Sequence, residues 1–503
     1  MKKYLIAFII LTITACGDFL EESSQDLVYA SSCEDLNEIL IGNAYMNNNI
    51  SEYSFRYASG GSYYPWLWIM DDDCEQFTKS GSEFTGQQLD GFYRWKASPF
   101  IQSNGSPIDD YEWERLYKHI AATNVVIDQV KEFPNDPEEL RNKVKGEALF
   151  LRAAYYYLLV NMYSAPYEEE KANSTLGVPL KQTSYIEDLK FHRTHQDTVY
   201  QSIIDDLTES AKCLTNINTK ELFKANSYSA WALLSRVYLY MEKWESVLQA
   251  CEEVEKGAFK LEKLTPEYSQ NFLRQSNPEI IFAQGSQCMA NIFGTLGGYM
   301  YKVSDNLLNS YTQEGEYKDL RIDVFFTSQS SRLAPGKIKS LINTFREPGD
   351  IPDAFVIRYA EVLLNKAEAL AMLHREDEAI EVLNHLLANR FEDGIFPAIS
   401  VKGNELIDFI RAERRRELCF EGHRWFDLRR YAVNTQYPLK NYEITHNIYA
   451  EKPESGVSAQ IGYCILKGYP EGKGWILPIP AFEININPAI GDNEREDATY
   501  VEL

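Results

Sequence analysis

The chain has 503 residues, of which 45% are hydrophobic, and its formal net charge is −24. This share of apolar residues is enough for a large core, which excludes an intrinsically disordered protein. Because an acidic surface repels phosphate backbones, we expect no nucleic acid among its partners.

The N-terminus has the pattern of an export signal. Two lysines precede an apolar run, Tyr4–Ile13, that is too short to cross a bilayer comfortably as a mature helix. Cys16 directly follows Ala15, as in a bacterial lipobox, so we expect residues 1–15 to be removed and Cys16 to be lipidated. An ordinary cleaved signal with a chance cysteine is the alternative. Acyl chains on Cys16 would hold a soluble body on a membrane.

Residues 16–30 are polar and acidic, which predicts a flexible tether before a folded body of residues 31–503. Seven cysteines remain besides Cys16, and none has C-x-x-C spacing: Cys33, Cys74, Cys213, Cys251, Cys288, Cys419 and Cys464. We expect mostly buried free thiols, with one or two disulfides left open in an exported protein.

Apolar residues at three-and-four spacing predict eight helices. Their approximate ranges are 113–130, 140–162, 199–214, 230–239, 243–257, 357–373, 376–391 and 404–420. Small residues such as Ala367, Ala369 and Ala379 allow close helix packing, as in tetratricopeptide repeats. We therefore predict a mostly α fold: four tetratricopeptide-like helix pairs in one integrated domain with long, irregular, loop-rich insertions.

Three irregular segments, about 53–100, 261–353 and 432–475, are expected to form the ligand face, because loops on a rigid scaffold often carry function. A sugar needs flat aromatic faces and polar side chains for its hydroxyls. The aromatic candidates are Tyr63, Tyr64, Trp66, Trp68, Trp95, Tyr299 and Tyr301, and the polar candidates are Asp72, Asp73, Arg94, Asn291 and Asn306. For any single one of these residues, local packing is favoured over a ligand contact. We assign Trp113, Trp231 and Trp425 to the core.

The stretch from Ile410 to Tyr431, IRAERRRELCFEGHRWFDLRRY, has dense charge among aromatic residues. A solvated helix face explains the charge but not the aromatic residues. Arginines that donate paired hydrogen bonds to carboxylates and stack on aromatic rings are typical of a partly buried ion-pair network. We therefore predict a structural lock, made of Glu413, Arg415, Glu417, Glu421, Arg424, Trp425 and Asp427.

Catalytic and metal-binding alternatives are weaker. Glu417 and Glu421 have a helical spacing that approaches a retaining glycosidase pair, but flanking arginines lower the pKa that a general acid needs raised. His423 has no second histidine at ligand spacing. The Asp71–Asp73 run could hold calcium, although a solvated loop is favoured because the turn glycine and alternating ligands are missing. We predict no enzyme, no metal and no cofactor.

Several separated segments resemble the SusD/RagB family of outer-membrane nutrient-binding lipoproteins. They are CGDFLEESSQ after the lipobox, GEALFLRAAYYYLLVNMY (146–163), ALLSRVYLYMEKWESVLQACEEV (232–254), NPEIIFA (277–283), RYAEVLLNKAEAL (358–370), ERRRELCFEGHRWFDLRR (413–430) and LPIPAFEININP (477–488). Segment 162–170 departs from the family, whose members usually have a glycine before the proline stretch.

This resemblance implies four tetratricopeptide-like helix pairs that support an irregular, ligand-binding face. It also implies a location at the outer membrane, facing the cell exterior, and a partner, a SusC-like TonB-dependent barrel. Family members generally bind glycans, and some bind peptides, without cleaving them. Asp18, Glu21 and Glu22 resemble the family's surface-export signal. A peptide-binding or purely protein-interacting lipoprotein of the same fold is the alternative.

Overall fold

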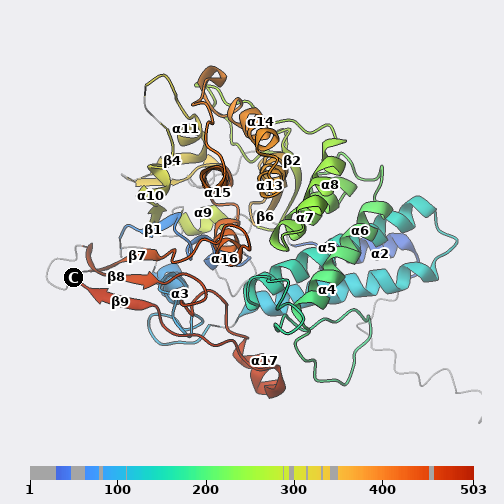
Figure 1. Cartoon of the computed structure of the whole chain (residues 1–503). Helices are drawn as coiled ribbons and strands as arrows, with labels where there is room; N and C mark the ends of the chain where they lie inside the picture. The colour runs from blue at the N-terminus through green and yellow to red at the C-terminus, as the bar shows by residue number, and fades with distance from the viewer. Residues whose placement is uncertain are drawn as a thin grey trace, which may run out of the picture.

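The computed structural model describes residues 30–46, 63–78, 83–108, 110–286, 288–293, 300–312, 315–329, 332–339, 349–451 and 458–503, with the backbone alone described for 83–87, 290–291 and 329. Figure 1 shows helices α4 to α8 on one side of the molecule and the strands β7, β8 and β9 on the other. Helices α13, α14 and α15 lie between them in this view.

All eight predicted helices are present. They are α4 (Tyr111–Gln129), α5 (Glu138–Tyr163), α6 (Gln196–Cys213), α7 (Ser227–Tyr240), α8 (Trp244–Glu255), α13 (Tyr359–Met372), α14 (Glu376–Leu387) and α15 (Asn404–Leu418). From α4 to α8 each helix packs on the next, α8 packs on α13, and α13 packs on both α14 and α15. The mostly α fold expected from the sequence is therefore confirmed.

Local sequence explains where these helices begin and turn. The carboxylate of Asp110 caps α4 by accepting from the backbone N–H groups of Glu112 and Trp113. Asn226 and Ser229 form a capping box at the start of α7. Short turns with one residue at positive φ, Glu242 at 57° and His374 at 60°, reverse the chain in the α7–α8 and α13–α14 pairs.

The remaining helical elements are short, apart from α3. They are α2 (Cys33–Ile39), η1 (Leu40–Ala44), η3 (Pro65–Trp68), α3 (Glu83–Tyr93), η4 (Val130–Glu132), α9 (Cys288–Phe293), α10 (Asp305–Leu308), α11 (Arg321–Phe325), η6 (Glu392–Gly394), α16 (Arg424–Val433), α17 (Ala481–Ile486) and η7 (Pro488–Ile490).

The described strands form small antiparallel sheets. β1 (Cys74–Gln76) pairs with β3 (Tyr301–Val303), β2 (Ile280–Gln284) with β6 (Phe355–Arg358), and β4 (Phe326–Gln329) with β5 (Arg332–Pro335), while β7 (Ile444–Glu451), β8 (Ser458–Leu466) and β9 (Thr499–Glu502) form a three-stranded sheet. The β1–β3 and β2–β6 pairs join segments far apart in sequence. The β1–β3 pair joins two irregular insertions to each other, and the β2–β6 pair packs on α7.

The hydrophobic core runs continuously from α2 to the C-terminal segment. All seven cysteines of the described residues are free thiols, and all but Cys213 are buried. The prediction of mostly buried free thiols is confirmed, and no disulfide forms among them.

None of the helices in the described ranges has the length and hydropathy needed to cross a membrane.

Candidate functional site

Glu417 on α15 lies at the centre of a buried ion-pair network. Its carboxylate accepts hydrogen bonds from Arg321, Arg358 and Arg390 at 2.6 to 3.1 Å. Glu279 accepts from Arg358 and Arg390 at 2.9 and 2.6 Å. Burial opposes ionisation, but the guanidinium groups outweigh it and hold the pKa of Glu417 well below its usual range.

The network continues along α15 in both directions. Glu413, one turn before Glu417, accepts from Arg321 at 2.5 Å. Glu421, just after the helix, accepts from Arg358 at 2.8 Å and from the buried ammonium of Lys337. These contacts fasten α15 to β6, α11 and the segment after β5.

A second cluster fastens α16 to α13. Asp427 accepts from Arg414 and Arg430, both at 2.8 Å. Arg430 in turn donates to both carboxylate oxygens of Glu368 at 2.5 and 2.8 Å. The Ile410–Tyr431 stretch is thus a buried ion-pair network, as an Arg-rich stretch among aromatic residues suggests.

The three tryptophans that the sequence assigns to the core lie in or against it. Trp113 and Trp425 are buried, and Trp231 is half-buried and packs on the core. Trp425 stacks on Trp475 with ring centroids 4.5 Å apart. This stack fastens α16 to the C-terminal segment.

Asp72 and Asp73 join the lock from a distant part of the chain. Arg424 donates to both oxygens of Asp72 at 2.7 and 2.9 Å, and Arg415 donates to Asp73 at 2.7 Å. Arg415 also donates to Asn306 at 2.6 Å. These contacts account for three polar side chains that we predicted from the sequence to bind a ligand, because each already has a partner within the fold.

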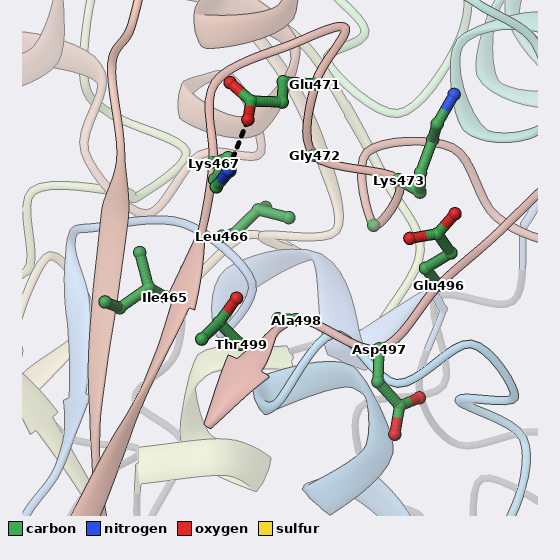
Figure 2. Close-up of a pocket in the computed structure, with 11 residues that line it drawn as sticks. Ile465, Leu466, Lys467, Glu471, Gly472, Lys473, Glu496, Asp497, Ala498 and Thr499 are labelled. Atoms are coloured by element: carbon green, nitrogen blue, oxygen red, sulfur yellow. Dashed lines mark hydrogen bonds and ion pairs between the residues drawn. The ribbon is translucent and has the colours of Figure 1, made fainter. Parts of the chain in front are cut away.

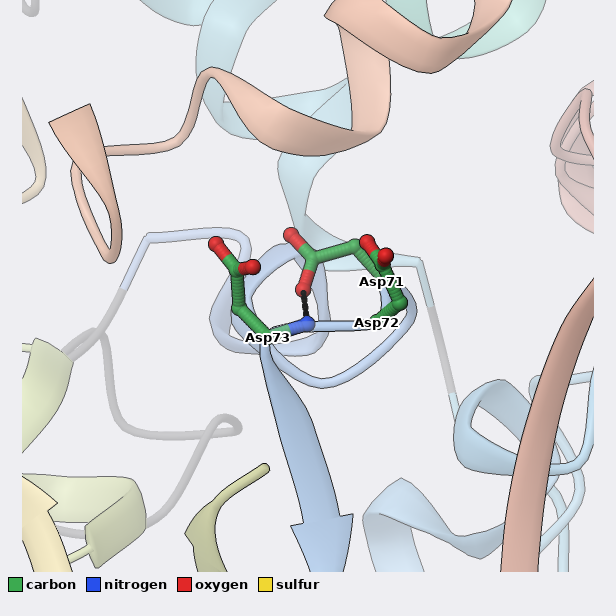
Figure 3. Close-up of side chains that lie close together, drawn as sticks. All are labelled: Asp71, Asp72 and Asp73. Atoms are coloured by element: carbon green, nitrogen blue, oxygen red, sulfur yellow. Dashed lines mark hydrogen bonds between the residues drawn. The ribbon is translucent and has the colours of Figure 1, made fainter. Parts of the chain in front are cut away.

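Asp71, Asp72 and Asp73 gather their carboxylates at one turn (Figure 3). One oxygen from each lies within 4.8 Å of the others, a spacing that suits a cation. The expected solvated loop is wrong, because Asp71 and Asp73 are only 6% and 1% exposed. Burial raises the pKa of Asp71 well above its usual range, while Arg415 and Arg424 face the other two carboxylates.

Six aromatic side chains predicted to face a ligand are part of the core, at most 3% exposed: Tyr63, Tyr64, Trp66, Trp68, Trp95 and Tyr301. All six contact other rings, and four of them stack. The ring centroids lie 5.6 Å apart for Tyr64 and Trp68, 5.4 Å for Trp66 and Phe92, and 4.1 Å for Trp95 and His446. A ring enclosed in this way offers no face to a sugar, so local packing is confirmed for these six residues and the ligand platform is wrong.

For four other residues the structure does not test the predicted role. Arg94 is partly exposed and pairs with Asp90 at 2.8 Å. Tyr299 and Cys16 lie outside the described residues, and only the backbone of Asn291 is described, within α9. A ligand role for Arg94, Asn291 and Tyr299, and the lipidation of Cys16, stay predictions.

The carboxylate pair on the lock cannot act as a glycosidase. Glu417 and Glu421 are almost completely buried, and neighbouring cations lower the pKa of both. A general acid needs the opposite shift and access to substrate. His423 is also buried, and burial together with nearby arginines lowers its pKa well below the usual range. It is a neutral structural residue.

An open cavity of about 430 Å³ lies where the segment after α5, the α7–α8 turn and the end of α16 meet. We call it the acidic cavity, and it is lined by Tyr167, Glu168, Glu169, Glu170, Lys171, Met241, Glu242, Trp244, Val433 and Thr435. Aromatic and aliphatic surface beside carboxylates is the combination that sugars require. The only sequence signal for it was the departure of segment 162–170 from the family pattern.

A second cavity, of about 250 Å³, lies between the end of β8, the segment 467–474 and the start of β9 (Figure 2). Its lining is polar and includes the Lys467–Glu471 ion pair drawn in the figure, with Lys473, Glu496 and Asp497 along one side. None of the described residues that line it is aromatic. It therefore lacks a stacking surface for a sugar ring.

Two family models match separate parts of the chain. The one described as "SusD family" matches residues 343–495, which include the lock. The one described as "Starch-binding associating with outer membrane" matches residues 77–239, which include α4 to α7. Together the two matches span more than half of the chain.

Relatives and solved structures agree with these matches. "SusD-like protein P38" of Formosa agariphila is 25% identical over 390 residues, covering 65% of this chain and 74% of the relative. A SusD superfamily protein of Bacteroides thetaiotaomicron VPI-5482 has a TM-score of 0.68 at 22% identity, covering 92% of this chain and 100% of its own.

A putative sugar binding protein of Bacteroides vulgatus ATCC 8482 has a TM-score of 0.69 at 23% identity, with 93% of this chain and 99% of that one covered. The shared fold therefore extends from the first helices to the C-terminal segment. With two family models matched along the same chain, the protein belongs to the SusD/RagB family.

Proposed function

We propose that the protein is an outer-membrane lipoprotein that binds an oligosaccharide or polysaccharide and passes it to a SusC-like TonB-dependent barrel. A glycan ligand is supported by the match of residues 77–239 to a family described as starch-binding and associating with the outer membrane. A solved structure of the same fold is described as a putative sugar binding protein. The barrel partner is proposed from the family resemblance.

The proposed anchor is a lipid on Cys16. Residues 16–30 would then connect the membrane to the helical body. Fully extended, a tether of this length reaches on the order of 50 Å. Such a reach lets the folded body sit on the mouth of a barrel or swing away from it, while remaining at the cell surface.

The acidic cavity is the described cavity whose size and lining best fit a sugar. Its volume, about 430 Å³, falls within the usual range for small-ligand pockets. The half-buried Tyr167 provides a ring face, and the exposed Glu170 provides acceptors for sugar hydroxyls. Several carboxylates would repel uronate or sulfate groups, so the cavity favours a neutral glycan.

Calorimetric titration of the folded body with neutral and acidic glycans tests this function. We expect binding of a neutral glycan, no release of cleaved products, and about fivefold weaker binding after Tyr167→Ala, because a stacked ring contributes about 1 kcal/mol. Tyr500→Ala, at an exposed tyrosine on β9, is the control. Binding of peptides and of no glycan would instead support the protein-interaction alternative.

Isolation of the protein from solubilised outer membranes tests separately whether it forms a complex with a barrel transporter. We expect a TonB-dependent barrel to co-purify in stoichiometric amount, and glycan affinity to persist in the body without the barrel. A body that binds glycan but never co-purifies with a barrel would overturn only the proposed complex.

A further inference from the structure

The acidic cavity holds more negative charge than its neighbouring lysines neutralise. One wall is the segment 167–171, and a second is the α7–α8 turn. Lys171 pairs with Glu168 at 2.6 Å, and Lys243, from the turn, pairs with Glu169. The second pair also ties the two walls together. Both lysines are therefore already engaged by two of the carboxylates.

Two further carboxylates of the lining have no cation beside them. Glu170 is exposed, and Glu242 is half-buried at the α7–α8 turn. Neither has a lysine, arginine or histidine at ion-pair distance among the described residues. Arg430 attracts Glu242 from further away, but it is itself paired with Asp427 and Glu368. The cavity thus presents two carboxylates that the fold leaves without a counter-ion.

Neutral donors hold Glu242 in place. Its carboxylate accepts from the side chain of Asn434 at 2.7 Å, from the backbone N–H of Thr435 at 3.0 Å and from the hydroxyl of Thr435. These three donors orient the group but bring no positive charge. Because an ionised carboxylate has about four acceptor sites, one of them stays available to a ligand. Burial raises the pKa of Glu242, so a bound cation would stabilise its charged form.

We propose that the acidic cavity prefers a glycan that carries protonated amino groups, such as an oligomer of glucosamine. This inference rests on the proposed function, since it names the substrate class of the same cavity. A sugar ring packs on Tyr167, and ammonium groups donate to Glu170 and to the remaining acceptor site of Glu242. An ammonium group has three N–H donors and a positive charge, so it gains more from these carboxylates than a hydroxyl does.

Other cations fit the cavity less well. A divalent metal ion needs several carboxylate oxygens within reach of one another, and among the described residues such a group occurs only at Asp71, Asp72 and Asp73. A lysine side chain of a peptide brings an ammonium group, but no flat C–H face to stack on Tyr167. An amino sugar combines the charge and the flat face in one ring.

Oligomers of glucose, N-acetylglucosamine and glucosamine with the same length and linkage test the preference, because they differ only in a hydroxyl, an acetamide or an amine. Calorimetric titration of the mature chain at pH 6, which keeps the amine protonated, measures the three affinities. We expect the glucosamine oligomer to bind about tenfold more tightly than the glucose oligomer, as one hydrogen bond to a charged group implies. The uncharged N-acetylglucosamine oligomer should not share this gain.

The outcomes separate this inference from the proposed function. Equal affinity for the glucose and glucosamine oligomers, or binding of another glycan but not of glucosamine, would overturn the inference alone. Absence of affinity for any glycan would overturn the proposed function as well. A lysine-rich peptide that bound in place of every glycan would have the same consequence.

Variants at the two carboxylates show whether the cavity itself selects the amine. Glu170→Gln should lower the preference to about threefold, and the further change Glu242→Gln should abolish it, if each carboxylate contributes equally. Tyr167→Ala should weaken the glucose and glucosamine oligomers by the same factor, because the ring stacks on either sugar. Glu245→Gln, at an exposed carboxylate beside Trp244 but outside the lining, is the matched control and should keep the preference. An equal loss in Glu245→Gln would show that the net charge of the chain attracts the amine, and would overturn the inference.

Discussion

Single residues in the lock show why a buried charge is tolerated. Removing a carboxylate from water costs several kcal/mol unless nearby cations and hydrogen bonds replace the lost hydration. Glu417 meets this condition with three arginines that reach it from other elements. The loss of its charge would leave these guanidinium groups buried with one counter-ion fewer.

Glu417→Gln should therefore lower the free energy of unfolding by about 3–5 kcal/mol, the usual cost of breaking a buried pair. Denaturant unfolding at neutral pH measures it. Glu471→Gln, at an exposed ion pair with Lys467, should change stability by less than about 0.5 kcal/mol. Equal stability of Glu417→Gln and the unaltered protein would show that the network contributes specificity rather than stability.

The buried carboxyl of Glu112 on α4 should make the stability of the protein depend on pH. Here burial raises the pKa, whereas in the lock arginines lower the pKa of Glu417. Burial raises the pKa of Glu112 from 4.5 to about 7. Between these values the folded state holds a proton that the unfolded state has lost, so stability falls as the pH rises through this window. Glu112→Gln should flatten the dependence by at most about 3 kcal/mol. Unfolding measured from pH 5 to pH 8 gives both slopes.

The control for this prediction is Glu114→Gln, which changes an exposed carboxylate on the same helix. It should keep the slope of the unaltered protein. Asp110 and Asp353, whose pKa values burial raises to about 6 and about 7, contribute in the same direction. The prediction therefore concerns the difference between the two variants, and equal slopes would contradict it.

At the scale of elements, the helices could be predicted because three-and-four spacing is a local signal. Whether the aromatic side chains of the irregular segments are buried or exposed could not be predicted, because their burial depends on partners that are distant in sequence. Trp66 stacks on Phe92, and Trp95 stacks on His446, with no pattern that links them. The lock is an intermediate case. Its own charges are evident in the sequence, but Arg321 and other partners from elsewhere in the chain have no local signal.

Gly146 illustrates how tertiary packing overrides helix propensity. In isolation, Gly→Ala within a helix stabilises by about 1 kcal/mol. At this site a Cβ atom would lie 2.6 Å from Cγ of Leu214, beside the end of α6. Gly146→Ala should therefore destabilise the protein by about 1–3 kcal/mol, the usual cost of overpacking. Thermal unfolding measures the change.

Gly42→Ala is the matched control, since a Cβ atom added at this position in η1 would meet no neighbouring group within 4 Å among the described residues. It should leave the melting temperature unchanged or slightly raised. If Gly146→Ala were also neutral, α5 and α6 would have room to separate, and their packing would be looser than the structure shows.

At the scale of the whole molecule, the lock joins segments that are far apart in the chain. Arg415 on α15 reaches Asp73, which is 342 residues away in sequence. The C-terminal segment is fixed in a similar way, because Arg495 donates to backbone carbonyls of Gly474 and Lys96. The irregular insertions and the helical body therefore depend on one set of polar contacts.

Arg415→Ala should lower the free energy of unfolding by about 3 kcal/mol, because two carboxylates lose a buried partner. Glycan affinity, measured well below the melting temperature, should stay unchanged, since Arg415 lies outside the acidic cavity. Arg375→Ala, at an exposed pair with Glu378, is the control and should have little effect on either quantity. Loss of binding without loss of stability would place the ligand at the lock instead.

A single residue, Cys16, should decide whether the protein is attached to the membrane. If Cys16 carries the lipid, Cys16→Ser removes the acyl chains and the protein should move from the membrane fraction to the soluble fraction. Cys213→Ser, at a half-buried free thiol, should leave the distribution unchanged. Fractionation with metabolic labelling by a fatty-acid analogue measures location and lipid together. A Cys16→Ser protein that stays membrane-bound without label would show that a protein partner, rather than a lipid, holds the body at the membrane.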